Sequence, residues 1–126
     1  MKKTNFLFGL LFALSLLLNT ELKAQTNMGV NDFVSTYKAT KNAQLLDVRS
    51  PGEWAGGKIA SSATINFYDA AFKQKIEKLD KKKPIFVYCA VGGRSTQASK
   101  VLQASGFKVY NLQGGGYNDL ARLGIK

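Results

Sequence analysis

The chain has 126 residues, of which 45% are hydrophobic, and a formal net charge of +10. This length is enough for one domain with its own core and too short for two. The positive charge favours attraction of small anions, but no aromatic interleaving or recognition module accompanies the lysines, so nucleic acid is not an expected partner.

Residues 1–24 differ in composition from the rest of the chain. Lysines near the start precede an apolar run from Phe6 to Leu18, and a polar stretch then ends at Ala24. This order is typical of a secretory signal peptide, and the apolar run is shorter than the roughly 20 residues that a membrane-spanning helix needs. We therefore expect a signal peptide over 1–24 and an exported domain over 25–126, periplasmic or secreted, with no stable membrane insertion after cleavage.

From residue 25 onward, helical and extended patterns alternate. Asn31 or Asp32 can cap a first helix, whose apolar residues at helical spacing are Phe33, Val34 and Tyr37. The run from Gln44 to Val48 predicts a buried strand, and Ser50-Pro51-Gly52 predicts a turn after it. A short strand is expected over 63–67.

The alternation continues in the second half of the chain. An amphipathic helix is expected over 69–79, with an apolar side formed by Ala70, Phe72, Ile76 and Leu79. The run Ile85-Phe86-Val87-Tyr88 is typical of a strand buried on both faces of a parallel sheet. The remaining expected elements are a helix over 94–105 that stops at Gly106, a strand over 108–112 and a short helix over 117–123.

Alternating strands and helices imply right-handed crossovers and a doubly wound, mainly parallel sheet with helices on both faces. Such an α/β sheet binds ligands at the carboxyl ends of its strands. Cys89 lies at that end of the strand over 85–88, directly before a glycine-containing loop and a helix. We therefore expect the functional site at this edge of the sheet.

Cys89 is the only cysteine in the chain, so it cannot form an internal disulfide, although export usually brings paired cysteines. Its anion is favoured by the following helix N-terminus and by peptide N–H groups that Gly92 and Gly93 leave unobstructed. Arg94 adds a positive charge, and cysteines in such surroundings have pKa values lowered from about 8.5 to roughly 3.5–7.5. The pattern favours a nucleophilic thiolate over an inert buried cysteine.

The loop from Cys89 to Arg94 resembles the active loop of the rhodanese family of sulfurtransferases, which begins with the catalytic cysteine and ends with an arginine. Two other segments resemble the family in the same order, Leu45-Leu46-Asp47-Val48-Arg49 with Glu53-Trp54 upstream and Leu112-Gln113-Gly114-Gly115 downstream. The resemblance implies that Cys89 is catalytic and that the substrate or persulfide is bound by the loop residues Ala90, Val91, Gly92, Gly93 and Arg94. It also implies that Asp47 and Arg49 support the site, and that Glu53 pairs with an arginine or anchors the turn.

By this resemblance, the domain moves sulfane sulfur from thiosulfate or a persulfide to a thiol or another nucleophilic acceptor through a Cys89 persulfide. The implied partners are small sulfur-containing anions or persulfides and a thiol acceptor, protein thiols included, with no metal or organic cofactor. Family members commonly have histidine where Lys58 stands, so no histidine is available as a general base, but sulfur transfer does not need one. Many members that use thiosulfate have a basic residue where Ala90 stands. We therefore expect thiosulfate to be a poorer donor than a thiol-borne persulfide.

Two other functions are compatible with part of this pattern. A non-catalytic rhodanese module would carry sulfur or bind a partner protein, but inactive copies often lack the cysteine that is present here. Phosphatases and arsenate reductases of this fold also place a cysteine and an arginine around an anion site, but their loop is one residue longer and surrounds a tetrahedral oxyanion. The shorter loop of this chain favours a single sulfur atom, so sulfur transfer is the preferred interpretation.

Overall fold

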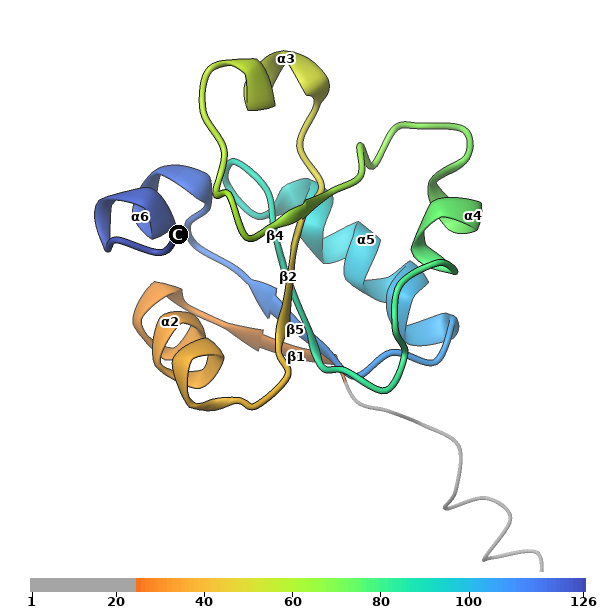
Figure 1. Ribbon diagram of the computed structural model, residues 1–126, viewed down its shortest axis with the longest axis horizontal. Coiled ribbons are helices and arrows are strands. Elements are labelled where there is room, and N and C mark those ends of the chain that lie inside the picture. Colours follow the sequence, from red (N-terminus) through yellow and green to blue (C-terminus); the bar gives the residue numbers. More distant parts are fainter. Residues whose placement is uncertain (1–24) are drawn as a thin grey trace, which may run out of the picture.

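The computed structural model describes residues 25–126, which form a five-stranded sheet with helices on both faces (Figure 1). The strands are β1 (Gln25–Met28), β2 (Gln44–Asp47), β3 (Ala63–Thr64), β4 (Ile85–Tyr88) and β5 (Val109–Leu112), arranged in the order β1-β5-β4-β2-β3. Each pairing is parallel, so the predicted α/β fold is confirmed. The predicted signal peptide lies outside the described residues.

The helices are α2 (Val30–Ala39), α3 (Pro51–Ala55), α4 (Phe72–Ile76), α5 (Gly93–Ala104) and α6 (Tyr117–Arg122). Helices α2 and α6 cover one face of the sheet, where Phe33, Phe86 and Leu120 share a core. Helices α4 and α5 cover the other face, where Val87 and Leu102 belong to a second core. Side chains of β4 therefore alternate between two buried layers, which explains why its sequence is apolar throughout.

The first helix begins earlier than predicted. Gly29 is its N-cap residue and no side chain caps it, so the prediction of Asn31 or Asp32 as the cap is wrong. The Phe33 N–H already donates to the Gly29 carbonyl at 2.9 Å, which places Asn31 and Asp32 inside the first turn. Strand β1, which precedes this helix, has a polar sequence and was not predicted; backbone pairing with β5 holds it at the sheet edge.

The segment between β2 and β4 is less regular than predicted. Strand β3 ends at Thr64, and α4 covers only the middle of the expected helix. Asp69 accepts a hydrogen bond from the Ala71 N–H at 2.8 Å and forms a turn before α4. Ala70 lies in that turn and is exposed, so its assignment to the buried side of a helix is wrong.

Helix α3 begins directly after its N-cap residue, Ser50, and includes Pro51 and Gly52. A simple turn was predicted for these three residues. Ser50 and Glu53 form a capping box: Ser50 Oγ accepts from the Glu53 N–H at 3.4 Å, and Glu53 Oε1 accepts from the Ser50 N–H at 3.2 Å. Pro51 fits the first turn because its missing N–H has no intrahelical partner there. Helix α3 lies beyond the carboxyl end of β2, on the same side of the sheet as the loop after β4 (Figure 1).

The last third of the chain follows the prediction within a residue or two at each boundary. Gly106 ends α5 with φ of 98°, a left-handed conformation that favours glycine. Across residues 25–126, the structure contains no helix with the length and apolar character needed to cross a membrane.

Candidate active site

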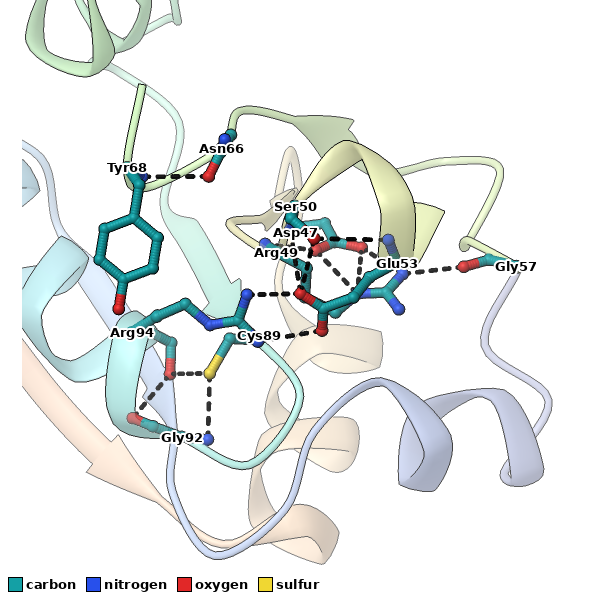
Figure 2. A network of polar contacts seen from close by, with 11 residues as sticks. Asp47, Arg49, Ser50, Glu53, Gly57, Asn66, Tyr68, Cys89, Gly92 and Arg94 are labelled. Atoms are coloured by element: carbon teal, nitrogen blue, oxygen red, sulfur yellow. Dashed lines mark hydrogen bonds and ion pairs between the residues drawn. The ribbon is translucent and has the colours of Figure 1, made fainter. Parts of the chain in front are cut away.

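Cys89 lies in a loop that connects the buried strand β4 to helix α5 (Figure 2). The residue is only 1% exposed. Gly92 is the N-cap of α5 and has φ of 108°, which a residue with a side chain rarely adopts. This turn brings the Gly92 N–H to 3.0 Å from the Cys89 sulfur, to which it donates a hydrogen bond. The loop therefore folds back over its own cysteine.

Opposing effects set the pKa of the Cys89 thiol. Burial raises this pKa, but hydrogen bonds from the hydroxyl and N–H of Ser95 and from the N–H groups of Gly92 and Val91 lower it by more. The protonated thiol donates to Ser95 Oγ at 3.6 Å, and a thiolate in the same place accepts from that hydroxyl. Because the net pKa is lowered, a larger fraction of Cys89 is the nucleophilic thiolate near neutral pH.

Arg94, in the first turn of α5, forms a bidentate ion pair with Glu53 of α3. Arg94 Nη1 donates to Glu53 Oε1 at 2.6 Å, and Nη2 donates to Oε2 at 3.0 Å. The hydrogen bond from Arg94 is the main reason that the pKa of Glu53 falls to about 2, and the same bond raises the pKa of Arg94. The pair stays charged at neutral pH, so it fixes the loop to α3 and balances the positive charge of Arg94.

Asp47 and Arg49 form a second, buried ion pair beside the site. Arg49 Nε lies 3.0 Å from Asp47 Oδ2, and Nη2 donates to the same oxygen at 2.8 Å. Nη2 also donates to the Gly57 carbonyl at 2.9 Å, and the guanidinium lies over the Tyr117 ring at 3.9 Å from its centre. These contacts connect the end of β2 to the segment after α3 and to α6. The Asp47–Arg49 pair therefore has a structural role beside the site.

The start of α6 packs directly against the backbone of the cysteine loop. The Tyr117 N–H donates to the Cys89 carbonyl at 2.9 Å. At Gly116, an added Cβ would lie 2.0 Å from the Ala90 carbonyl oxygen and 2.3 Å from that of Cys89. Only glycine allows the two backbones to approach this closely without rearrangement.

These contacts place the catalytic candidate, its anion-stabilising donors and a charge-balanced arginine in the loop after β4 and the first turn of α5, at the carboxyl edge of a parallel sheet. A protein-family model described as the Rhodanese-like domain matches residues 30–119, a segment that contains the whole site. The chain belongs to the rhodanese-like domain family.

Relatives and solved structures agree with this assignment. The uncharacterized protein YqhL of Bacillus subtilis is 37% identical over 76 residues, which are 60% of this chain and 59% of that protein. The thiosulfate sulfurtransferase GlpE of Coxiella burnetii is 36% identical over 72 residues, 56% of this chain and 65% of that protein. The chain thus spans less than two thirds of the length of these relatives. A rhodanese-related protein from Thermoplasma volcanium superposes with a TM-score of 0.65 at 28% identity, over 80% of this chain and 95% of that chain.

Not every residue of this rhodanese-like site was predicted. Cys89 to Gly92 lie in the loop after β4, and Gly93 and Arg94 lie in the first turn of α5, while the contacts of Asp47 and Arg49 lie next to this segment. Ser95 was not assigned a role, although its place directly after the loop, in the first turn of α5, is a signal that could have indicated one. Within 25–126, the structure contains no group of His, Cys, Asp or Glu side chains arranged to hold a metal ion.

The lowered pKa of this rhodanese-like cysteine can be measured from the rate of Cys89 alkylation as a function of pH. We expect the midpoint to lie below the value of about 8.5 for an ordinary thiol, and Ser95→Ala to move it upward because a donor to the thiolate is lost. Thr96→Val is the matched control. The hydroxyls of Thr96 and Ser95 both donate to the Gly92 carbonyl, but the Ser95 hydroxyl is the one that contacts the sulfur. A wild-type midpoint at or above that of an ordinary thiol, or equal shifts in both variants, would contradict the assignment.

Proposed function

We propose that this domain is a sulfurtransferase that moves sulfane sulfur from thiosulfate or a persulfide donor to a thiol or other nucleophilic acceptor through a Cys89 persulfide. The observation that carries the proposal is the Gly92 N–H 3.0 Å from the Cys89 sulfur, with the Ser95 hydroxyl beside it. This arrangement stabilises an anionic sulfur at the carboxyl end of β4. Relatives named as sulfurtransferases support a general sulfur-transfer role.

In the first half-reaction, the Cys89 thiolate attacks the outer sulfur of the donor. A bond forms between Cys89 Sγ and that sulfur, and the bond from the outer sulfur to the rest of the donor breaks. The donor leaves with the electron pair, as a thiolate or, from thiosulfate, as sulfite. Covalent catalysis of this kind divides one difficult transfer into two easier steps.

In the second half-reaction, the acceptor attacks the terminal sulfur of the Cys89 persulfide. The new bond joins the acceptor to the transferred sulfur, and the electron pair of the broken bond returns to Cys89 as thiolate. The low pKa of Cys89 favours this step because it makes the cysteine a better leaving group. The N–H groups of the loop are already in place, so they stabilise the charge without reorganisation.

The proposal is tested by intact-mass measurement of the reduced protein after incubation with thiosulfate or with a small organic persulfide. The expected result is a gain of one sulfur atom, which cyanide then removes as thiocyanate. A stable gain that no acceptor removes would favour a sulfur-carrier module with little turnover. If no donor adds sulfur while Cys89 remains free and reduced, the sulfurtransferase proposal fails.

Ala90 provides a test of donor choice. A basic side chain next to the nucleophile attracts a dianionic donor, and a partly exposed contact of this kind contributes on the order of 1 kcal/mol, or several-fold in rate. We therefore expect Ala90→Arg to increase the rate of sulfur uptake from thiosulfate several-fold, with less effect on an uncharged persulfide donor. Ala90→Gln is the uncharged control, and high salt should remove part of the gain. An equal increase in both variants would show that charge is not the cause.

We also propose that the protein is exported and that residues 1–24 are removed. The basic start, the apolar run from Phe6 to Leu18 and the small residue Ala24 support this proposal. Cleavage after Ala24 would keep all the described residues of β1, Gln25–Met28, in the mature chain. Intact-mass analysis of protein from the native cell envelope or medium is expected to show a chain that starts near Gln25. A chain that retains residues 1–24 would contradict export by this route.

A further inference from the structure

Two of the large exposed hydrophobic residues belong to the surroundings of Cys89. Across residues 25–126, the large hydrophobic residues with high exposure are Tyr68 at 74%, Val91 at 78% and Leu123 at 42%. Val91 belongs to the cysteine loop itself. Tyr68 follows the segment that leaves β3 at the carboxyl edge of the sheet, and Figure 2 shows its ring beside Arg94 with the hydroxyl toward that side chain. Exposed apolar side chains are informative when they gather at one place.

The position of Tyr68 is set by its backbone. Asn66 accepts hydrogen bonds from the N–H groups that follow it: Oδ1 accepts from Tyr68 at 3.0 Å, and the carbonyl accepts from Asp69 at 3.0 Å. The raised pKa of Arg94 is due first to Glu53, and smaller contributions come from Cys89 and Tyr68. A tight turn thus holds an exposed aromatic ring next to the reactive loop.

The charges next to this ring are paired. Arg94 is bound by both carboxylate oxygens of Glu53, and Asp69, directly after Tyr68, forms an ion pair with Lys75. Ala90 and Val91 add no charge to the loop. Although the chain has a net charge of +10, the loop and the ring beside it present an apolar surface with balanced charges, which suits an uncharged organic group better than an inorganic dianion.

We propose that Tyr68 and Val91 form an apolar rim that selects sulfur compounds in which the reacting sulfur is attached to an apolar organic group. This inference rests on the proposed sulfur transfer and names its substrate class. The acceptor is a small organic thiol, RSH, whose R group packs on Tyr68 and Val91 as the sulfur approaches Cys89. The thiol releases its proton to solvent, and its thiolate attacks the terminal sulfur of the Cys89 persulfide. The products are RSS⁻ and the Cys89 thiolate.

The test compares two acceptors that react through the same group, benzyl mercaptan and 2-mercaptoethanol. The measured quantity is the ratio of their rates of sulfur removal from the Cys89 persulfide, each divided by its uncatalysed rate with a small-molecule persulfide. The wild-type ratio should favour the benzyl compound. Ring contacts contribute enough that Tyr68→Ala should lower this ratio roughly three- to tenfold, and Val91→Ala should lower it less because valine is smaller. Tyr68→Phe should preserve the ratio because it retains the ring.

Leu123→Ala is the matched control, since Leu123 is also exposed but lies at the end of α6. It should leave the ratio unchanged. A merely structural effect of Tyr68→Ala on the loop would change the rates of both acceptors together and leave their ratio intact. A wild-type ratio of the two acceptor rates near one would contradict the proposal that Tyr68 and Val91 select the acceptor. A ratio that Tyr68→Ala and Val91→Ala do not alter would contradict it too.

A second measurement separates the rim from sulfur transfer. Iodoacetamide and N-benzyliodoacetamide alkylate Cys89 through the same uncharged reacting group, so the ratio of their rates reports on the rim without any sulfur donor. The benzyl preference and its loss in Tyr68→Ala are expected here too. If wild-type protein takes up no sulfur but shows this preference, the proposed function fails and the rim remains as a binding surface. If sulfur is transferred without the preference, only the rim fails.

Discussion

Replacement of Cys89 by serine is expected to abolish sulfur uptake from every donor. Serine keeps the size of the side chain, but its hydroxyl is not ionised at neutral pH and cannot form a stable bond to transferred sulfur under these conditions. Loss of a covalent nucleophile commonly lowers turnover by at least about a thousandfold. Because Cys89 is the only cysteine in the chain, no other thiol can take its place. Intact-mass analysis after donor treatment, together with cyanolysis, measures the loss.

The Cys89→Ser variant should still fold. Its hydroxyl can accept from the Gly92 N–H and donate to Ser95 Oγ, the two groups that contact the sulfur, so its urea midpoint should lie near that of the wild type. A normal midpoint with no sulfur uptake assigns the loss to chemistry. Sulfur uptake by this variant at the wild-type rate would contradict the Cys89 persulfide and the proposed function with it.

The fold could be predicted because its central strand has a distinctive sequence. Ile85-Phe86-Val87-Tyr88 is apolar on both sides, and in the structure its side chains enter two separate cores. The loop after it could also be predicted, since Cys89, the glycines and Arg94 are contiguous and their relation depends on local geometry. Local sequence signals of this kind predict the structure because short-range backbone preferences and tertiary packing favour the same conformation.

Features that depend on distant partners could not be predicted in the same way. Strand β1 has a polar sequence, and only its pairing with β5 makes it a strand. Glu53 and Arg94 lie 41 positions apart. The family resemblance implies that Glu53 pairs with an arginine or anchors the turn, but the local sequence does not identify Arg94 as its partner or predict the short helix α3 that positions Glu53. The exposed ring of Tyr68 has no periodic pattern to identify it. In each case, tertiary placement supplies what local sequence preferences lack.

Gly116→Ala is expected to destabilise the protein by about 1–3 kcal/mol, the usual cost of inserting an atom into a well-packed interior. Gly116 has φ of −172°, an extended backbone that alanine also adopts, so conformational strain is not the reason. The reason is contact. The new methyl group would overlap the carbonyl oxygens of Ala90 and Cys89, at 2.0 Å and 2.3 Å. These atoms are backbone, so no side-chain rotation relieves the overlap.

Relief of this overlap requires the start of α6 to move away from the cysteine loop. The hydrogen bond from the Tyr117 N–H to the Cys89 carbonyl would then lengthen or break, which leaves a buried carbonyl poorly paired. We therefore expect Gly116→Ala to change both the urea midpoint and the rate of Cys89 alkylation. The loop would no longer hold the Gly92 N–H against the sulfur as firmly.

Gly52→Ala is the matched control, since an added Cβ there meets no atom within 4 Å. Gly52 lies in α3, where alanine is the better helix former, so this variant should unfold at the same urea concentration as the wild type or a higher one. Equal urea midpoints for Gly116→Ala and Gly52→Ala would contradict a rigid contact between α6 and the loop. A lower midpoint for Gly116→Ala with unchanged alkylation of Cys89 would instead show that α6 stabilises the fold without shaping the reactive site.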